Sequence, residues 1–187
     1  NRSVGLRSFG ADPERAARLG RELIRGMQEE GVAACAKHFP GKGKAEVDSH
    51  RSLPVISRPA GELLSRDLLP FRKAVSAGVA AVMTSHAAYP RLDGGRIGPA
   101  TFSFRICAEL LRKRISFSGV LITDDLGMGA IGQAPAAAAE KAIRAGADIA
   151  LLCHQPAAVG TTVEILRSLA DADESFRKRW EESRRRI

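Results

Sequence analysis

The sequence is poor in aromatic residues and in cysteine, and it has no long hydrophobic run. Aromatic side chains make up 5% of the chain, too few to suggest a stacking platform for nucleic-acid bases. No stretch approaches the ~20 apolar residues that a membrane span needs, and Asn1–Ser3 does not open a signal peptide. Cys35, Cys107 and Cys153 are far apart and form no Cys-x-x-Cys pair, which argues against a disulfide framework or a zinc site. We expect a soluble protein of a reducing cytoplasm, without membrane association.

The net charge of +8 invites a nucleic-acid interpretation, but the excess is spread along the chain. The densest basic stretches are Arg177–Arg179 and Arg184–Arg186. Glu174, Glu181 and Glu182 lie among them at helical spacing, where acidic and basic side chains pair. We therefore expect a solvated terminal helix and no nucleic-acid partner.

Four short apolar runs alternate with segments of helical periodicity. Each run has the continuous apolar character of a strand that is buried on both faces of a parallel sheet. The runs cover residues 32–37, 79–84, 119–123 and 148–153. The pattern predicts a parallel α/β protein, and no linker or low-complexity segment divides residues 1–187, so we expect one domain.

Capping residues and helix breakers set the expected helix boundaries. Asp12 is a helix cap before a segment with one apolar face. A helical stretch over residues 60–77 contains Pro70, which predicts a bend there. Thr101 or Ser103 caps the helix before the third strand.

Polar side chains gather where the predicted strands end. Lys37, His38, His86, Asp124 and His154 all lie at or just beyond the carboxyl ends of successive strands. In a (β/α)8 barrel this is the catalytic face, and in an open α/β sheet it is the edge where ligands bind. Strand spacing alone leaves both architectures open.

The loop after the first strand carries the densest set of reactive residues. Pro40, Gly41 and Gly43 prevent regular structure there. The loop leads to Asp48-Ser49-His50, in which a carboxylate two residues from an imidazole can hold one ring nitrogen and leave the other free for proton transfer. We interpret this loop as chemical in function, the alternative being a polar surface loop.

These residues resemble a known enzyme family. The motifs are Lys37-His38-Phe39-Pro40-Gly41 with Gly43, Asp48-Ser49-His50, Gly5-Leu6-Arg7-Ser8-Phe9-Gly10, Met83-Thr84-Ser85-His86 and Ile122-Thr123-Asp124-Asp125-Leu126-Gly127-Met128. In their order along the chain, which begins with Gly5–Gly10, these motifs are similar to those of family 3 of the glycoside hydrolases, in the branch of bacterial β-N-acetylglucosaminidases. Lys42 stands where that family often has histidine.

The resemblance implies a TIM-type barrel of which this chain holds the carboxyl-terminal part, about four to five βα units, because a full barrel has eight. The expected domain is thus a single catalytic domain over residues 1–187 that lacks the amino-terminal strands. The implied substrates are N-acetylglucosaminides, specifically the muropeptides released during peptidoglycan recycling in the bacterial cytoplasm. Neither a cofactor nor a metal is implied.

The resemblance also assigns roles. Asp124 matches the nucleophile that forms a covalent glycosyl-enzyme, and His50 matches the acid/base, with Asp48 as its partner. Lys37, His38 and Arg7 match residues that hydrogen-bond the hydroxyls of the terminal sugar. A retaining glycosidase needs a nucleophile and an acid/base of this kind.

Other interpretations remain open on the sequence. Asp124 or Asp125 can cap the turn that follows the third strand, Asp125 being the better candidate. His86 is equally suited to a structural or a supporting role. A metal-dependent hydrolase is disfavoured by the absence of His-x-His and His-Glu-x-x-His patterns. A neutral His50 would not repel phosphate, which leaves phosphorolysis open, and an inactive barrel remnant is the non-enzymatic alternative.

Overall fold

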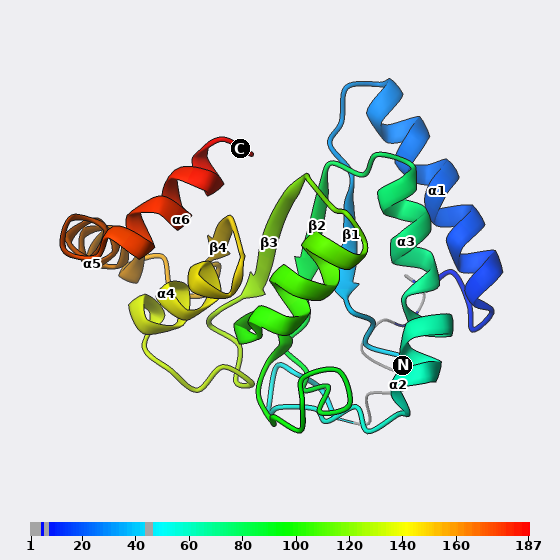
Figure 1. Ribbon diagram of the computed structural model, residues 1–187, viewed down its shortest axis with the longest axis horizontal. Coiled ribbons are helices and arrows are strands. Elements are labelled where there is room, and N and C mark those ends of the chain that lie inside the picture. Colours follow the sequence, from blue (N-terminus) through cyan, green and yellow to red (C-terminus); the bar gives the residue numbers. More distant parts are fainter. Residues whose placement is uncertain (1–4, 6–7, 44–46) are drawn as a thin grey trace.

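The sheet is parallel and has four strands. The computed structural model describes all residues except 1–4, 6–7 and 44–46. The strands β1 (Cys35–Phe39), β2 (Ala81–Thr84), β3 (Val120–Asp125) and β4 (Ile149–Leu151) pair in the order β1-β2-β3-β4 (Figure 1). This confirms the predicted parallel α/β architecture. β1 and β3 both run two residues further than predicted, so that the residues expected just beyond the sheet lie on its last rungs.

One helix precedes β1, and helical segments follow each strand. They are α1 (Pro13–Glu29), α2 (Ala60–Glu62), the π-helical η2 (Leu63–Asp67), α3 (Leu69–Ser76), the 3₁₀ turn η3 (Ala100–Phe102), the π-helical η4 (Arg105–Arg114), α4 (Pro135–Ala145), α5 (Ala158–Ala172) and α6 (Glu174–Arg184). Among the described residues, none of these helices is both long and apolar enough to span a membrane.

The predicted boundaries are confirmed where caps set them. Asp12 accepts a hydrogen bond from the backbone N–H of Glu14 at 3.0 Å and starts α1. Pro70 lies in the first turn of α3, shortly after the π-helical η2, where a residue without an N–H is tolerated. Ser103 caps the helical segment that begins at Phe104 and continues as η4, since its Oγ accepts from the N–H of Ile106 at 3.1 Å.

Two apolar clusters hold the helices to the sheet. The larger cluster lies under α1, α3 and η4, and in it Phe39 and Phe71 pack edge-on with ring centroids 5.2 Å apart. The smaller cluster joins α4, α5 and α6. The prediction that all strands are buried on both faces is wrong: β3 alternates between buried and half-buried residues, and β4 is half-buried throughout. One face of these strands is therefore partly open among the described residues.

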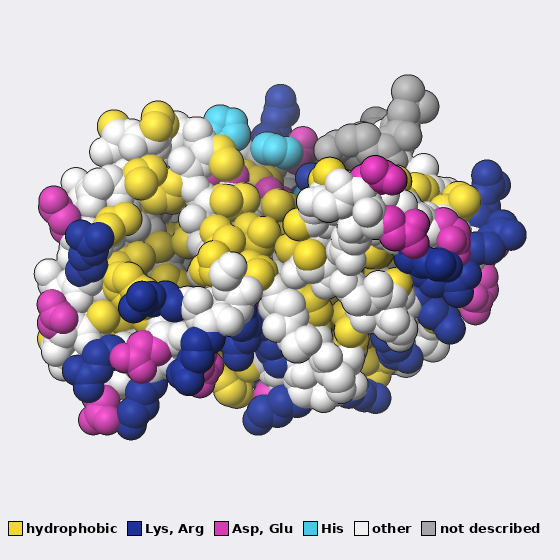
Figure 2. All heavy atoms as spheres, turned by 90° about the horizontal axis from the view of Figure 1, so that it is seen from above, with side chains coloured by type: hydrophobic (Ala, Val, Ile, Leu, Met, Phe, Trp, Pro, Cys, Tyr) yellow, Lys and Arg dark blue, Asp and Glu magenta, His cyan; other side chains and the backbone are white. Residues whose placement is uncertain are grey.

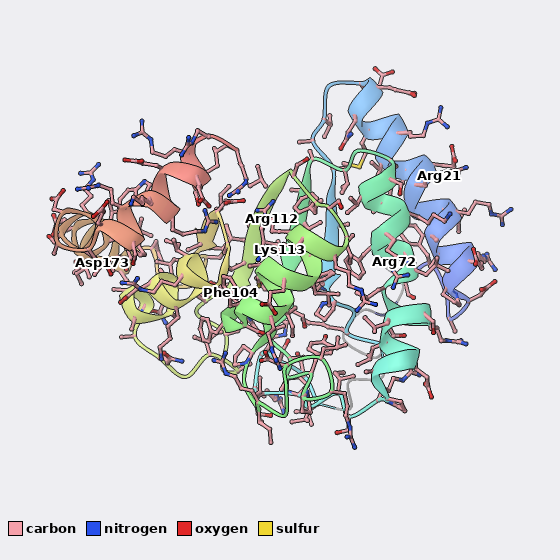
Figure 3. The ribbon with its side chains drawn as sticks, in the orientation of Figure 1. Arg21, Arg72, Phe104, Arg112, Lys113 and Asp173 are labelled. Carbon is pink, nitrogen blue, oxygen red and sulfur yellow. The ribbon has the colours of Figure 1, made fainter. Side chains whose placement is uncertain are left out.

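The terminal helix α6 is docked, which corrects the expectation of a solvated helix. Phe176 is fully buried and meets Trp180 edge-on with ring centroids 6.2 Å apart. Asp173, at the junction of α5 and α6 in Figure 3, caps the helix by accepting from the N–H of Ser175 at 2.8 Å. Charge pairs such as Lys178 with Glu174, at 2.7 Å, cover the outer side as predicted.

A buried carboxylate fastens α6 to the sheet. The Asp148 side chain is 0% exposed and accepts from Arg179 at 2.7 Å, from Arg186 at 3.1 Å and from Arg112 of η4, which is labelled in Figure 3. It also accepts from the backbone N–H of Leu121 at 2.9 Å. Burial raises the pKa of Asp148, but the hydrogen bonds from Leu121 and Arg179 lower it by more. The pKa of Asp148 therefore lies below the ordinary value. Asp148 is thus ionised and joins β3, η4 and α6.

Apolar side chains also reach the surface. Figure 2 shows them gathered across the middle of the face that is seen from above. A hollow of about 280 Å³ between α4, β4, α5 and α6 is lined mainly by apolar side chains, Trp180 and Val163 among them. None of the predicted site residues lines this hollow.

We predict that Asp148→Asn lowers the free energy of unfolding by ~3–5 kcal/mol, because it leaves three half-buried guanidinium groups without their common counterion. Urea denaturation at pH 7 measures this loss. Asp171→Asn, an exposed aspartate on α5, is the matched control and should unfold like the wild type. Equal denaturation midpoints for Asp148→Asn and the control would contradict the structural role of Asp148.

Candidate active site

The parallel sheet brings side chains from two strands and one loop to the same edge. Asp124 is the second-last residue of β3. Its Oδ2 lies 3.5 Å from Nε2 of His38 on β1 and 3.4 Å from Nζ of Lys42 in the loop after β1. The three side chains are 18%, 15% and 9% exposed, respectively. The other carboxylate oxygen, Oδ1, accepts from the backbone N–H of Asp125 at 3.0 Å. Asp124 is thus largely enclosed but still reachable.

The electrostatics favour an ionised Asp124. Burial raises the pKa of this carboxyl, while the charges of His38 and Lys42 and the N–H of Asp125 lower it by more. The resulting pKa is below the ordinary value for aspartate. At neutral pH the group is a carboxylate with one oxygen directed at the Lys42 ammonium and the His38 imidazole, and an ionised carboxylate is the state that a nucleophile requires.

The neighbouring Asp125 has a structural role, as the sequence indicated. Its Oδ1 accepts from the backbone N–H of Gly127 at 3.1 Å and of Cys153 at 2.9 Å, and its Oδ2 contacts Nδ1 of His154. These bonds close the turn after β3 and tie it to the end of β4. His154 itself is 73% exposed, on the rim.

His86 is a buried member of the scaffold. Its Nε2 donates to the backbone carbonyl of Asp125 at 3.0 Å, because a carbonyl oxygen only accepts, and its Nδ1 accepts from Oγ1 of Thr101 at 2.7 Å. Thr84 lies 2.8 Å from the same Thr101 oxygen. Burial lowers the pKa of His86. Both nitrogens are therefore occupied, and the ring supports the end of β3.

Asp48 and His50 form the predicted pair. Oδ1 of Asp48 lies 2.7 Å from Nδ1 of His50 and also accepts from the backbone N–H of His50 at 3.1 Å. These bonds, the backbone bond first, lower the pKa of Asp48. An ionised Asp48 only accepts, so Nδ1 of His50 carries a proton and Nε2 is the nitrogen that can exchange one. The two side chains are 46% and 63% exposed, respectively.

The segment that bears His50 is docked onto the loop after β3. The backbone N–H of Gly129 donates to the carbonyl of His50, and that of Ala130 donates to the carbonyl of Ser49, both at 3.2 Å. A Cβ at position 129 would lie 2.7 Å from the His50 carbonyl oxygen, so only glycine permits this approach. The side chain of Ser49 is buried and meets Nζ of Lys42 at 3.0 Å.

Sequence reasoning missed Lys42 and Gly129. Lys42 stands out in the sequence only as a departure from the related family, and nothing in the sequence indicates which carboxylate it contacts. Of the predicted sugar-binding residues, His38 reaches Asp124, Lys37 is an exposed residue of β1, and Arg7 lies outside the described residues. The structure thus brings Asp124 and His38 together and forms the Asp48–His50 pair.

Within the part of the chain that the structure describes, no three His, Cys, Asp or Glu side chains converge as metal ligands do. Cys35, Cys107 and Cys153 are all free thiols.

The model for the glycosyl hydrolase family 3 N-terminal domain matches residues 1–187. The chain belongs to glycoside hydrolase family 3. A β-hexosaminidase of Pseudomonas aeruginosa is 41% identical over 169 residues, which are 89% of this chain and 49% of that protein. A β-hexosaminidase of Thiobacillus denitrificans is 41% identical over 157 residues, 82% of this chain and 42% of that protein. The chain spans about half the length of these curated relatives or less.

Solved structures of family 3 share the fold. A β-N-acetylglucosaminidase from Paenibacillus superposes with a TM-score of 0.90 at 39% identity and covers 98% of this chain and 35% of its own. NagZ from Neisseria gonorrhoeae, solved in complex with N-trifluoroacetyl-D-glucosamine, gives a TM-score of 0.76 at 38% identity and covers 97% and 52%. The family assignment and the TIM-barrel-like α/β class predicted from the motifs are therefore confirmed.

We predict that Gly129→Ala undocks the His50 segment, because the new methyl group would collide with the carbonyl oxygens of His50 and Arg51, at 2.7 and 2.8 Å. Hydrogen exchange at the Ala130 amide, which the Ser49 carbonyl protects, should become faster by tenfold or more, on the order of 1.4 kcal/mol of lost protection.

The matched control is Gly26→Ala on α1, where a Cβ meets nothing within 4 Å. This variant should leave exchange at Ala130 unchanged. Unchanged exchange in Gly129→Ala as well would show that the two loops do not depend on each other.

Proposed function

We propose that this chain carries the catalytic centre of a retaining exo-β-N-acetylglucosaminidase. The supporting observation is the enclosed Asp124 carboxylate, kept ionised by His38 and Lys42, with the Asp48–His50 pair on a segment docked to the loop that follows it. Relatives named β-hexosaminidase and β-N-acetylglucosaminidase support the substrate class.

In the first step the Oδ2 or Oδ1 lone pair of Asp124 attacks the anomeric carbon of the terminal sugar. The glycosidic C–O bond breaks, and its electron pair goes to the departing oxygen, which takes a proton from Nε2 of His50. Asp48 holds the imidazole by Nδ1 and stabilises its cationic form before the transfer. The product is a glycosyl ester of Asp124.

In the second step water replaces the aspartate. Nε2 of His50, now without its proton, takes one from the attacking water, and the ester bond to Asp124 breaks with its electron pair returning to the carboxylate. Two inversions at the anomeric carbon give net retention.

Donor side chains select the sugar. Lys37 and Arg7 can only donate hydrogen bonds, and His38 lies beside the nucleophile, so these three residues would bind hydroxyl and acetamido oxygens of a terminal N-acetylglucosamine. The proposed natural substrates are peptidoglycan-derived muropeptides in the bacterial cytoplasm. We further propose that residues 1–187 act as one catalytic domain together with additional barrel strands outside these residues.

We predict that Asp124→Asn lowers kcat/KM on 4-nitrophenyl β-N-acetylglucosaminide by on the order of 10³-fold or more, because an amide cannot form the glycosyl ester. Release of 4-nitrophenol measures this, with Asp171→Asn of α5 as the matched control at wild-type rate. If this chain is silent, the assay is repeated in a longer chain with further barrel strands, and silence in both contradicts the proposal.

His50→Gln gives a second, independent prediction. The 4-nitrophenolate group leaves without a proton, whereas the alcohol of a natural glycoside does not. The glycosylation rate of the variant should therefore fall ~10²- to 10⁴-fold on an N-acetylglucosaminyl-N-acetylmuramic acid disaccharide. With the aryl substrate the glycosylation rate should fall clearly less. Equal losses of the glycosylation rate on both would remove His50 from the acid role.

The same assays separate the alternatives. A chelator or added zinc should not change the rate, and inactivation by the chelator would favour a metal-dependent hydrolase. With phosphate present, N-acetylglucosamine should remain the product, and N-acetylglucosamine 1-phosphate would indicate phosphorolysis instead.

A further inference from the structure

Lys42 connects the two halves of the site. Its Nζ lies 3.4 Å from Oδ2 of Asp124 and 3.0 Å from Oγ of Ser49, and its side chain is only 9% exposed. Asp124 belongs to β3, while Ser49 stands between Asp48 and His50 in the segment after β1.

The chemistry of the ammonium group explains why one residue can serve both contacts. It has three N–H donors and no acceptor, so it suits a carboxylate oxygen and a hydroxyl oxygen at once. Ser49 is buried, and its hydroxyl would lose a hydrogen-bond partner without Lys42. The contact therefore adds a side-chain tie to the two backbone bonds that dock this segment at Gly129 and Ala130.

Three groups on different elements face Asp124 with positive charge or a polarised N–H. His38 comes from β1, Lys42 from the loop after it, and His86 from the end of β2, whereas the Asp125 backbone N–H lies on β3 itself. Burial lowers the pKa of His86, so that ring supplies little charge at neutral pH. His38 carries charge only when it is protonated. Lys42 is thus the contact that combines a cation with a tie to the acid/base segment.

We propose that Lys42 is a positioning residue for the glycosidase reaction, which keeps Asp124 ionised and holds the Asp48–His50 segment against β3. This inference rests on the proposed function for its catalytic consequence, but its two physical effects can be measured without turnover.

The first test is the titration of Asp124 by carboxyl carbon NMR, its signal assigned by its loss in Asp124→Asn. Lys42→Met should raise the pKa of Asp124 by about one unit or more, since a neighbouring cation is lost, and Lys42→Arg should restore most of the shift. Ser49→Ala should leave the pKa of Asp124 in place and speed exchange at the Ala130 amide. An unchanged Asp124 titration in Lys42→Met overturns the proposal, as does an equal shift in Ser49→Ala.

The second test is kinetic and separates this inference from the proposed function. In an active wild-type chain, Lys42→Met should lower kcat by roughly 10- to 100-fold with little change in KM, and the acid limb of its pH profile should move to higher pH. That direction follows because the Asp124 pKa, now depressed, rises when the cation is removed. A raised KM alone would make Lys42 a sugar-binding residue and overturn the proposal. A wild type that is inactive both as this chain and as a longer chain with further barrel strands refutes the proposed function, and the titration then decides the role of Lys42 alone.

Discussion

Parallel pairing of the strands is the constraint on which the site depends. Because β1, β2, β3 and β4 all run in one direction, their carboxyl ends share one edge of the sheet. His38 and Asp124 are 86 positions apart in the chain, on strands separated by β2, and still approach within 3.5 Å. The apolar clusters under the helices fix the strands, and the site follows from where the strands end.

Two aspartates show how the same interaction serves different purposes. Asp148 and Asp124 are both enclosed, both lie near cationic side chains, and both have a pKa below the ordinary value. Asp148 is 0% exposed and saturated by arginine and backbone donors, so it can only hold β3, η4 and α6 together. Asp124 keeps 18% of its side chain exposed and has fewer partners. The remaining access is what the proposed role of Asp124 as nucleophile requires.

The sequence predicted what depends on local spacing. The Asp48–His50 contact follows from two residues in one short loop, and the strand ends follow from apolar runs. The sequence could not predict the contact of Lys42 with Asp124. The two residues are 82 positions apart, and the sequence does not indicate the direction in which a flexible side chain points. Docking of α6 was missed for a related reason, since Phe176 and Trp180 are two aromatic residues in a charged segment and their burial depends on the partner surface. Arg7, outside the described residues, stays a prediction.

Trapping the glycosyl-enzyme tests the role of Asp124 as nucleophile most directly. A 5-fluoro N-acetylglucosaminyl fluoride reacts with a retaining enzyme and leaves slowly, because the ring fluorine destabilises the oxocarbenium-like transition state. The experiment uses this chain, or a longer chain with further barrel strands where turnover needs them. Peptide mass spectrometry should then find one sugar on the peptide that contains Asp124. A sugar on another carboxylate, or turnover of the reagent with inverted product and no labelled peptide, would contradict the assignment of Asp124 as nucleophile.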